Sequence, residues 1–254
     1  MILAVDVGNT QTVVGLFEGE RLVAHWRIAS DASATPDELV IKVDALLGVP
    51  GHAWSAVERV IVASVVPHLT DAWNDASMKA TGREPMVVGP GLKTGLPIRS
   101  DNPHEVGADR IVNGVAALAA YGAPVLVVDF GTATTIDVID STGSYLGGVI
   151  APGVETSAEA LFAKAARLSK VDLLDPGTVI GRNTRQSVQA GLIIGGAVMV
   201  DGLVRRIWGE LGHQTPVVAT GGLSHRMSAI CETVTDVDVD LTLKGLMMVY
   251  ERNS

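Results

Sequence analysis

The chain has little cysteine, few aromatic residues and no cluster of positive charge. Its 254 residues include a single cysteine, Cys231, so no disulfide can form within the chain, and we expect a reducing, cytoplasmic location. Aromatic residues make up only 4% of the sequence, so aliphatic side chains must fill the core. A net charge of −9 and the lack of any run of Lys or Arg argue against a nucleic-acid partner.

The sequence also argues against a zinc-binding protein and against a membrane-spanning protein. The six histidines show no HxH or HExxH spacing, and no Cys/His pattern typical of zinc occurs. No basic stretch precedes the apolar amino end, and Asp6 interrupts it early, which argues against a signal peptide. The most apolar helix expected, residues 191–204, contains Gly195, Gly196 and Asp201 and is predicted to be too short to span a bilayer. We therefore expect a soluble protein without a membrane partner.

One motif occurs twice. Residues 1–17 read MILAVDVGNTQTVVGLF, and residues 124–139 read PVLVVDFGTATTIDVI. In each, an apolar strand leads through an aspartate, Asp6 or Asp129, to a turn with Gly8 or Gly131. Glycine lets the backbone approach a ligand closely, and the neighbouring hydroxyl and amide groups can donate hydrogen bonds to oxyanions. A single copy is equally well explained as an ordinary tight turn, but two copies predict a pair of phosphate-binding hairpins that share one nucleotide.

The expected elements follow the same order in both parts of the chain. A hydrophobic content of 47% with 28 glycines is typical of an α/β protein with many turns. The segments VIVASVVP (residues 60–67) and VVATGGL (residues 217–223) occupy corresponding places, which supports an internal duplication. We therefore predict an α/β protein with two duplicated lobes and mixed sheets, comprising residues 1–121 and 122–254.

Periodicity and turn residues place the individual elements. Strands are expected at residues 2–5, 12–17, 21–28, 59–66, 85–88, 125–129, 135–139, 147–150 and 215–219. Helices are expected after the capping signal Thr35-Pro36-Asp37-Glu38, and at residues 69–81, 108–121, 157–168, 184–209 and 241–250.

Several motifs occur in the order found in type III pantothenate kinases: DVGNT, DNPHEVGADR, DFGTATT, GGVIAPG, ATGG and DLTLKGL. The chain resembles this family over residues 2–252, almost its whole length. The resemblance implies two ribonuclease-H-like lobes, as in the superfamily of actin, sugar kinases and heat-shock chaperone ATPases. It further implies ATP-dependent phosphorylation of pantothenate to 4′-phosphopantothenate, the first step of coenzyme A biosynthesis, by a homodimer. The apolar residues 191–204 are a candidate dimer interface, although burial within one subunit explains them equally well.

The resemblance implies an ATP site made by both hairpins and a later Gly-Gly turn. Its expected residues are Asp6, Val7, Gly8, Asn9, Thr10, Gln11, Thr12, Val13, Gly131, Thr132, Gly221 and Gly222. Because Mg²⁺ keeps much of its hydration in proteins, Asp6 is a candidate to hold it through water. By symmetry Asp129 is a second such ligand, whereas the resemblance implies that Asp129 helps to bind a monovalent cation, K⁺ or NH₄⁺.

A second candidate region is the segment Gly107-Ala108-Asp109-Arg110. From residue chemistry alone, Asp109 is equally well a first-turn acid favoured by the helix dipole, with Arg110 as an ion-pair partner. A kinase that acts on an acidic alcohol also needs a carboxylate to accept the hydroxyl proton and a cation to bind the substrate. The resemblance implies that Asp109 is the catalytic base, that Arg110 binds the pantothenate carboxylate, and that Gly107 and Ala108 line the pocket.

Thr184 and Ser100 complete the pantothenate site that the resemblance implies. Without the resemblance, Thr184 is interpreted as a helix N-cap. Ser100 stands where many family members carry a tyrosine that contacts the substrate, so a kinase of another small hydroxy compound is an alternative. A nucleotide-binding regulator without turnover is a second alternative, but Asp6 and Asp109 favour an enzyme, because a pure switch needs no base. Cys231 is interpreted as a packing residue.

Overall fold

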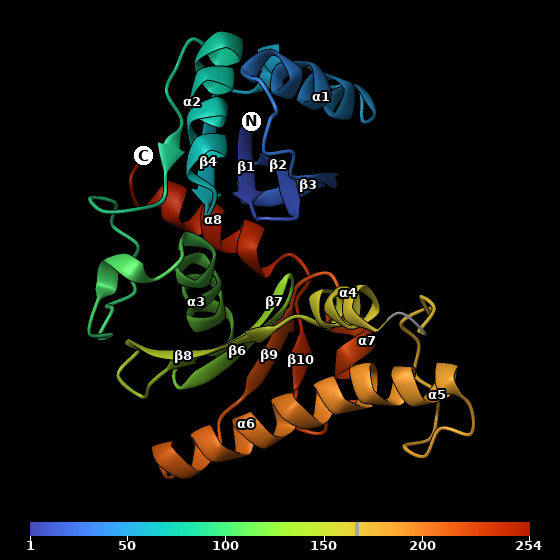
Figure 1. Ribbon diagram of the computed structural model, residues 1–254. Helices are drawn as coiled ribbons and strands as arrows, with labels where there is room; N and C mark the ends of the chain where they lie inside the picture. Colours follow the sequence, from blue (N-terminus) through green and yellow to red (C-terminus); the bar gives the residue numbers. More distant parts are fainter. Residues whose placement is uncertain (166–167) are drawn as a thin grey trace. The chain divides into compact units, whose positions relative to one another are not determined.

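The structure is a computed structural model that describes residues 1–165 and 168–254. Its secondary-structure elements are labelled in Figure 1. The chain divides into two compact units. The first unit comprises Met1–Pro97, Asp101–Ala116 and Asp240–Ser254, and the second comprises Ile98–Ser100 and Ala117–Val239.

The first unit is built on a five-stranded mixed sheet with the order β3-β2-β1-β4-β5. Its strands are β1 (Ile2–Val7), β2 (Gln11–Glu18), β3 (Arg21–Ala29), β4 (Arg59–Ser64) and β5 (Met86–Val87). β1 pairs with β2 in the antiparallel sense and with β4 in the parallel sense. Along β1, Leu3, Val5 and Val7 belong to one hydrophobic core, so the alternating residue Asp6 lies on the opposite face of the sheet.

Helices pack on both faces of this sheet. α1 (Pro36–Gly48) begins with the predicted capping box of Thr35 and Glu38, and it packs with α2 (Pro67–Thr81) on the face of Leu3 and Val5. α8 (Leu241–Glu251) contacts β1, β2 and β4 from the other face. The unit also contains the short 3₁₀ helices η1 (Trp54–Ala56) and η2 (Pro103–Glu105) and the first part of α3 (Ala108–Tyr121).

The second unit has a five-stranded mixed sheet with the order β10-β9-β6-β7-β8. Its strands are β6 (Val125–Phe130), β7 (Ala133–Ile139), β8 (Tyr145–Pro152), β9 (Val217–Thr220) and β10 (Asp236–Val237). β6 pairs antiparallel with β7 and parallel with β9, as β1 does with β2 and β4. The two sheets therefore share one strand order and the same directions, which confirms the predicted α/β fold with a repeated mixed sheet.

The helices of the second unit are α4 (Val154–Lys164), α5 (Thr184–Gln189), the π-helix η3 (Ala190–Ile194), α6 (Gly195–Leu211) and α7 (Ser224–Ser228). Val128 and Phe130 of β6 pack with Ile193 and Val200 in its core. The helix predicted at residues 157–168 begins earlier, at Val154, and its predicted residues 166–167 lie outside the described part of the chain.

The long apolar helix of the second unit lies where a helix was expected. α5, η3 and α6 form one helical run, Thr184–Leu211, of 28 residues, which is long and apolar enough to cross a membrane by length and composition. The helix expected at residues 184–209 is therefore confirmed, but the expectation that residues 191–204 are too short to span a bilayer was wrong, because Gly195, Gly196 and Asp201 do not interrupt the run. Val200 and Val204 are fully buried in the unit, so packing in a protein core accounts for part of this apolar character.

The compact units differ in extent from the lobes predicted as residues 1–121 and 122–254. Asp240–Ser254 belongs to the first unit, because α8 packs on β1, β2 and β4. Ile98–Ser100 belongs to the second unit, where the backbone N–H of Arg99 donates to the carbonyl of Tyr145 at 2.8 Å. The boundaries of the two duplicated lobes remain a prediction.

Candidate active site

The first hairpin turn lies between β1 and β2. Val7 pairs with Thr12, and the backbone N–H of Gly8 donates to the carbonyl of Gln11 at 3.1 Å. A β-carbon at Gly8 would stand 2.8 Å from that carbonyl oxygen, closer than real contacts allow, so the turn requires glycine. Asn9 and the neighbouring Thr10 and Gln11 are exposed, which leaves the tip of the turn open to a ligand.

Some residues predicted to bind ATP in this turn have side chains that a ligand cannot reach. Val7 is buried in the core, and Thr12 is buried with its hydroxyl 2.8 Å from the hydroxyl of Ser30. These two residues can therefore contribute only backbone groups to a ligand. Val13 is half-buried in β2 and pairs with Asp6 of β1.

The second hairpin turn, between β6 and β7, is shorter. Phe130 pairs with Thr134, so three residues form the turn, compared with four between Val7 and Thr12. The backbone N–H of Gly131 donates to the carbonyl of Ala133 at 3.0 Å. The two turns share the preceding aspartate and the glycine but differ in how their hydroxyl residues are placed.

Asp129 and Gly221 meet at the ends of two parallel strands. Asp129 of β6 pairs with Thr220 of β9, and Gly221 follows with a φ of +92°. A β-carbon there would stand 2.3 Å from Oδ1 of Asp129 and 2.7 Å from the carbonyl oxygen of Phe130. Any other residue at 221 would be strained and would displace these oxygens. The second unit thus brings together Asp129, Gly131 and Gly221.

Sequence reasoning missed two residues that support the second turn. The backbone N–H of Gly153 donates to the carbonyl of Thr132 at 3.0 Å, and the hydroxyl of Thr156 donates to the same carbonyl at 2.7 Å. A β-carbon at Gly153 would stand 2.3 Å from the carbonyl oxygen of Gly131. The motif GGVIAPG ends at this glycine, and it was the available signal in the sequence.

Asp109 lies in the first turn of α3 in the first unit. Its Oδ1 accepts a hydrogen bond from the backbone N–H of Arg110 at 2.8 Å. Burial raises the pKa of the Asp109 carboxyl above its ordinary value, although the N–H and the positive charge of Arg110 act in the opposite direction. A largely buried carboxyl with a raised pKa is the expected state of a general base that must hold a proton transiently.

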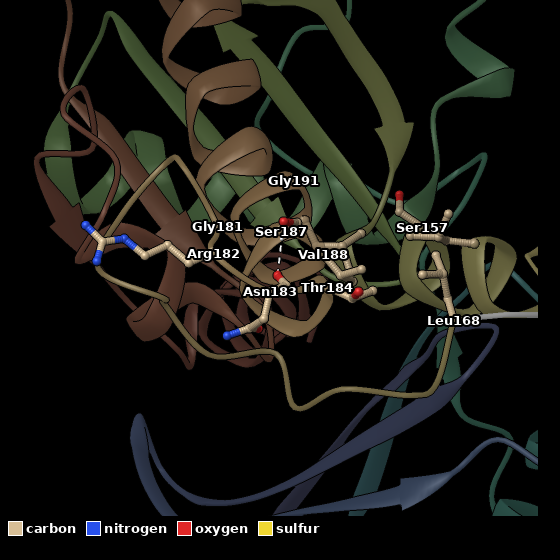
Figure 2. A pocket seen from close by; sticks show the side chains of 11 residues that line it. Ser157, Leu168, Gly181, Arg182, Asn183, Thr184, Ser187, Val188 and Gly191 are labelled. Atoms are coloured by element: carbon tan, nitrogen blue, oxygen red, sulfur yellow. Dashed lines mark hydrogen bonds between the residues drawn. The ribbon is translucent and has the colours of Figure 1, made fainter.

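Thr184 lies in a cavity of about 760 Å³ within the second unit. Figure 2 shows its lining side chains, which come from α4, from residues 168 and 181–183 between α4 and α5, and from the helical run that begins at Thr184. The interpretation of Thr184 as a helix N-cap was wrong: Asn183 is the N-cap, and its side chain accepts from the N–H of Gln186 at 2.9 Å. The Thr184 hydroxyl is therefore not required for capping.

Ser100 is half-buried in the second unit. Its hydroxyl oxygen is buried and has no hydrogen-bond partner among the described residues. A buried hydroxyl without a partner costs free energy, so a ligand atom would be a favourable partner for it. Within the described part of the chain, no group of three or more His, Cys, Asp or Glu side chains could hold a metal ion.

Comparisons with known proteins agree on one family and one fold. A family model described as type III pantothenate kinase matches residues 2–206. A type III pantothenate kinase of Moorella thermoacetica is 49% identical over 254 residues, covering 100% of both chains. A crystal structure of a Baf family protein from Campylobacter jejuni is 18% identical, with a TM-score of 0.63 and coverage of 99% of this chain and 98% of that one.

A more distant structure extends the fold comparison to sugar kinases. The inorganic polyphosphate/ATP-glucomannokinase of Arthrobacter sp. strain KM is 14% identical, with a TM-score of 0.52, and the match covers 99% of this chain and 98% of that one. At such identities the likeness concerns the fold alone. Both structures therefore support the α/β fold with two repeated mixed sheets.

Proposed function

The chain belongs to the type III pantothenate kinase family, and from this premise we propose which of its residues carry out the reaction. It is a kinase that phosphorylates pantothenate in coenzyme A biosynthesis. The observation that carries the proposal is the buried carboxyl of Asp109, at the start of α3, whose raised pKa suits a base.

Asp109 is the catalytic base of this proposal. Its carboxylate accepts the proton of the substrate's 4′-hydroxyl while the hydroxyl oxygen forms a bond to the γ-phosphorus of ATP. The bond from that phosphorus to the bridging oxygen breaks, and ADP leaves with the electron pair. A positioned base contributes about 10²–10⁴-fold to the rate, and orientation of the reactants contributes much of the rest.

The two hairpin turns are the proposed phosphate-binding elements. The exposed residues Asn9 and Thr10 in the first turn, and Thr132 beside Gly131 in the second, carry amide and hydroxyl donors. Gly221 and Gly222 belong to the same proposed set. Backbone donors at tight glycine turns are typical phosphate ligands.

The side chains near the first turn fit a Mg²⁺ ion that is bound largely by water and phosphate. The described residues contain no cluster of three acidic or metal-binding side chains, so the chain itself supplies few direct ligands. Mg²⁺ often binds to proteins in this way, through one or two carboxylates. Asp6, at the end of β1, would hold it, and its charge would neutralise the phosphates of ATP.

A monovalent cation is proposed at Asp129. Oδ1 of Asp129 and the carbonyl oxygen of Phe130 converge beside Gly221, since a β-carbon at that glycine would stand 2.3 Å from the first and 2.7 Å from the second. Hard cations prefer carboxylate and carbonyl oxygens. We therefore assign K⁺ or NH₄⁺ to this place.

Arg110, Thr184 and Ser100 are the proposed substrate contacts, together with Gly107 and Ala108. Arg110 offers a cation to the pantothenate carboxylate, since a guanidinium matches a carboxylate with two parallel hydrogen bonds. The Thr184 hydroxyl lies in a cavity large enough for a small substrate, and the Ser100 hydroxyl has no hydrogen-bond partner among the described residues.

A homodimer in the cytoplasm completes the proposal. Val198 of α6 is 63% exposed although Val200 and Val204, on the same helix, are fully buried. Single exposed apolar side chains are common on protein surfaces, so the homodimer is proposed from the family to which the chain belongs. The single cysteine agrees with a reducing compartment.

The decisive experiment measures ADP release and phosphopantothenate, by mass spectrometry, from the purified protein with ATP and pantothenate. Turnover in K⁺ buffer, its loss in Na⁺ buffer, and its collapse in Asp109→Asn are expected. Asp44→Asn, at an exposed position of α1, is the matched control and should keep full activity. Nucleotide binding without turnover on pantothenate in either salt would refute the proposal, and a panel of other small alcohols would then identify the acceptor.

A further inference from the structure

α3 and α8 touch at a glycine in the first unit. A β-carbon at Gly245 would stand 2.0 Å from the carbonyl oxygen of Val112 and 2.6 Å from its carbonyl carbon. Both of these are backbone atoms, which cannot rotate away as a flexible side chain would. Only glycine therefore allows the two helices to approach so closely, and Figure 1 shows them next to each other.

A buried hydrogen bond lies next to this contact. The hydroxyl of Thr242 donates to Oδ1 of Asn113 at 2.7 Å, and Asn113 is only 1% exposed. Thr242 and Gly245 are three residues apart on α8 and share one of its faces, whereas Val112 and Asn113 are consecutive on α3. The two contacts together fix both the separation of the helices and their register.

α8 is itself firmly attached to the sheet of the first unit. Leu243 is 2% exposed, and its side chain would meet a β-carbon at Gly15 of β2 at 2.8 Å. At the start of the helix, Nδ1 of His25 lies 2.7 Å from Oδ1 of Asp240. Because α8 contacts both the sheet and α3, it fixes the position of α3 relative to the sheet of the first unit.

Asn113 follows Asp109 by four residues, about one helical turn. We propose that Thr242, Asn113 and Gly245 are positioning residues, which hold the first turn of α3 where the Asp109 carboxylate can accept the substrate proton. The proposal rests on the role of Asp109 proposed above. A displacement of a reacting group by about 1 Å can cost about 10²-fold in rate, so a modest shift of α3 is sufficient to slow turnover.

The test compares Thr242→Val, which removes the hydroxyl at nearly constant shape, with Thr242→Ser, which keeps it. Thr242→Val should lower kcat about tenfold, leave the KM for ATP unchanged and shift the acidic limb of the kcat–pH profile. Thr242→Ser should recover most of the wild-type kcat and the wild-type profile. Gly245→Ala should lower kcat further, because it forces the helices apart.

Thr81→Val is the matched control. The hydroxyl of Thr81 donates to the carbonyl of Ser77 at 2.8 Å within α2, and its removal should lower the melting temperature without changing kcat or the pH profile. The kcat of Gly245→Ala is interpreted only if circular dichroism shows that the variant folds. The comparison of Thr242→Val with Thr242→Ser tests the proposal even if Gly245→Ala does not fold.

Two results would overturn the proposal, and they are distinguishable. If wild-type protein turns over pantothenate, and Thr242→Val changes only the melting temperature, as Thr81→Val does, Thr242 is merely structural and the proposal is wrong. If the wild type itself does not phosphorylate pantothenate, the proposed function fails first, and the positioning role fails with it.

Discussion

Gly107 leaves room for the Asp109 carboxylate: a β-carbon at position 107 would stand 2.5 Å from Oδ1 of Asp109. The same oxygen accepts the N–H of Arg110 at 2.8 Å, so the carboxylate is held between the start of the helix and the residue before it. The carbonyl of Gly107 in turn accepts the N–H of Ile111 at 3.1 Å, in the first turn of α3. The glycine therefore both begins the helix and shapes the pocket of the base.

The first prediction concerns this glycine. Gly107→Ala should push the Asp109 carboxylate out of place and lower kcat by about tenfold or more, because a misplaced base loses much of its contribution. Steady-state kinetics with varied pantothenate measure the effect. Gly48→Ala is the control, since a β-carbon there meets nothing within 4 Å. Equal kcat in the two variants would show that the Gly107 contact does not position the base.

The sheets could be predicted from the sequence because their signal is local. β1 and β6 are continuous apolar runs that end at an aspartate and a glycine turn, and such runs are typical of buried strands. Helix α3 was predicted with its observed ends, Ala108 and Tyr121. The two residues of β10 carry no such signal, and this strand was missed.

Contacts distant in sequence could not be predicted in the same way. The close approach of Gly245 to Val112 and the support of the Thr132 carbonyl by Gly153 and Thr156 depend on how the elements pack. Periodicity shows which face of a helix is apolar, but it does not show which partner that face meets. The helical run Thr184–Leu211 was expected at residues 184–209, but Gly195 and Gly196 were wrongly expected to break it, because glycines are tolerated where tertiary packing supports a helix.

The second prediction concerns Asp109 and stability. Because burial raises the pKa of Asp109, the folded state binds this proton more tightly than the unfolded chain does. The protonated group thus favours folding below the unfolded-state pKa, and this advantage is lost as the pH rises through the raised folded-state pKa. At neutral pH the ionised carboxylate is therefore unfavourable for folding compared with a neutral amide.

Asp109→Asn should consequently be more stable than the wild type at neutral pH while it loses kcat by about 10²–10⁴-fold. The gain should appear as a higher melting temperature than that of the wild type at neutral pH. It should shrink towards pH ~4, near the ordinary pKa of aspartate. Differential scanning calorimetry across this pH range gives the result. A variant less stable than the wild type at neutral pH would contradict the inferred cost of the buried charge.

The third prediction concerns the support of the second hairpin turn. A β-carbon at Gly153 would stand 2.3 Å from the carbonyl oxygen of Gly131 and 2.5 Å from that of Thr132. Gly153→Ala should therefore displace the turn and raise the KM for ATP about tenfold, with a smaller effect on the KM for pantothenate. The control is Gly209→Ala in α6, where a β-carbon meets nothing within 4 Å. If both variants bind ATP equally well, the second turn does not contact the nucleotide.

The last prediction concerns the thiol of Cys231, which lies in the loop after α7. Burial, and then the negative charge of Asp201, raise its pKa to about 12. Asp201 keeps its place because Oδ1 accepts the N–H of Thr233 at 2.9 Å and Oδ2 accepts the N–H of Glu232 at 2.9 Å. Since the thiolate is the reactive form, iodoacetamide should label Cys231 very slowly at pH ~8 in the folded protein and readily in urea. Intact-mass spectrometry follows the labelling, and rapid stoichiometric labelling of the folded protein would show that the thiol is neither shielded nor held neutral by Asp201.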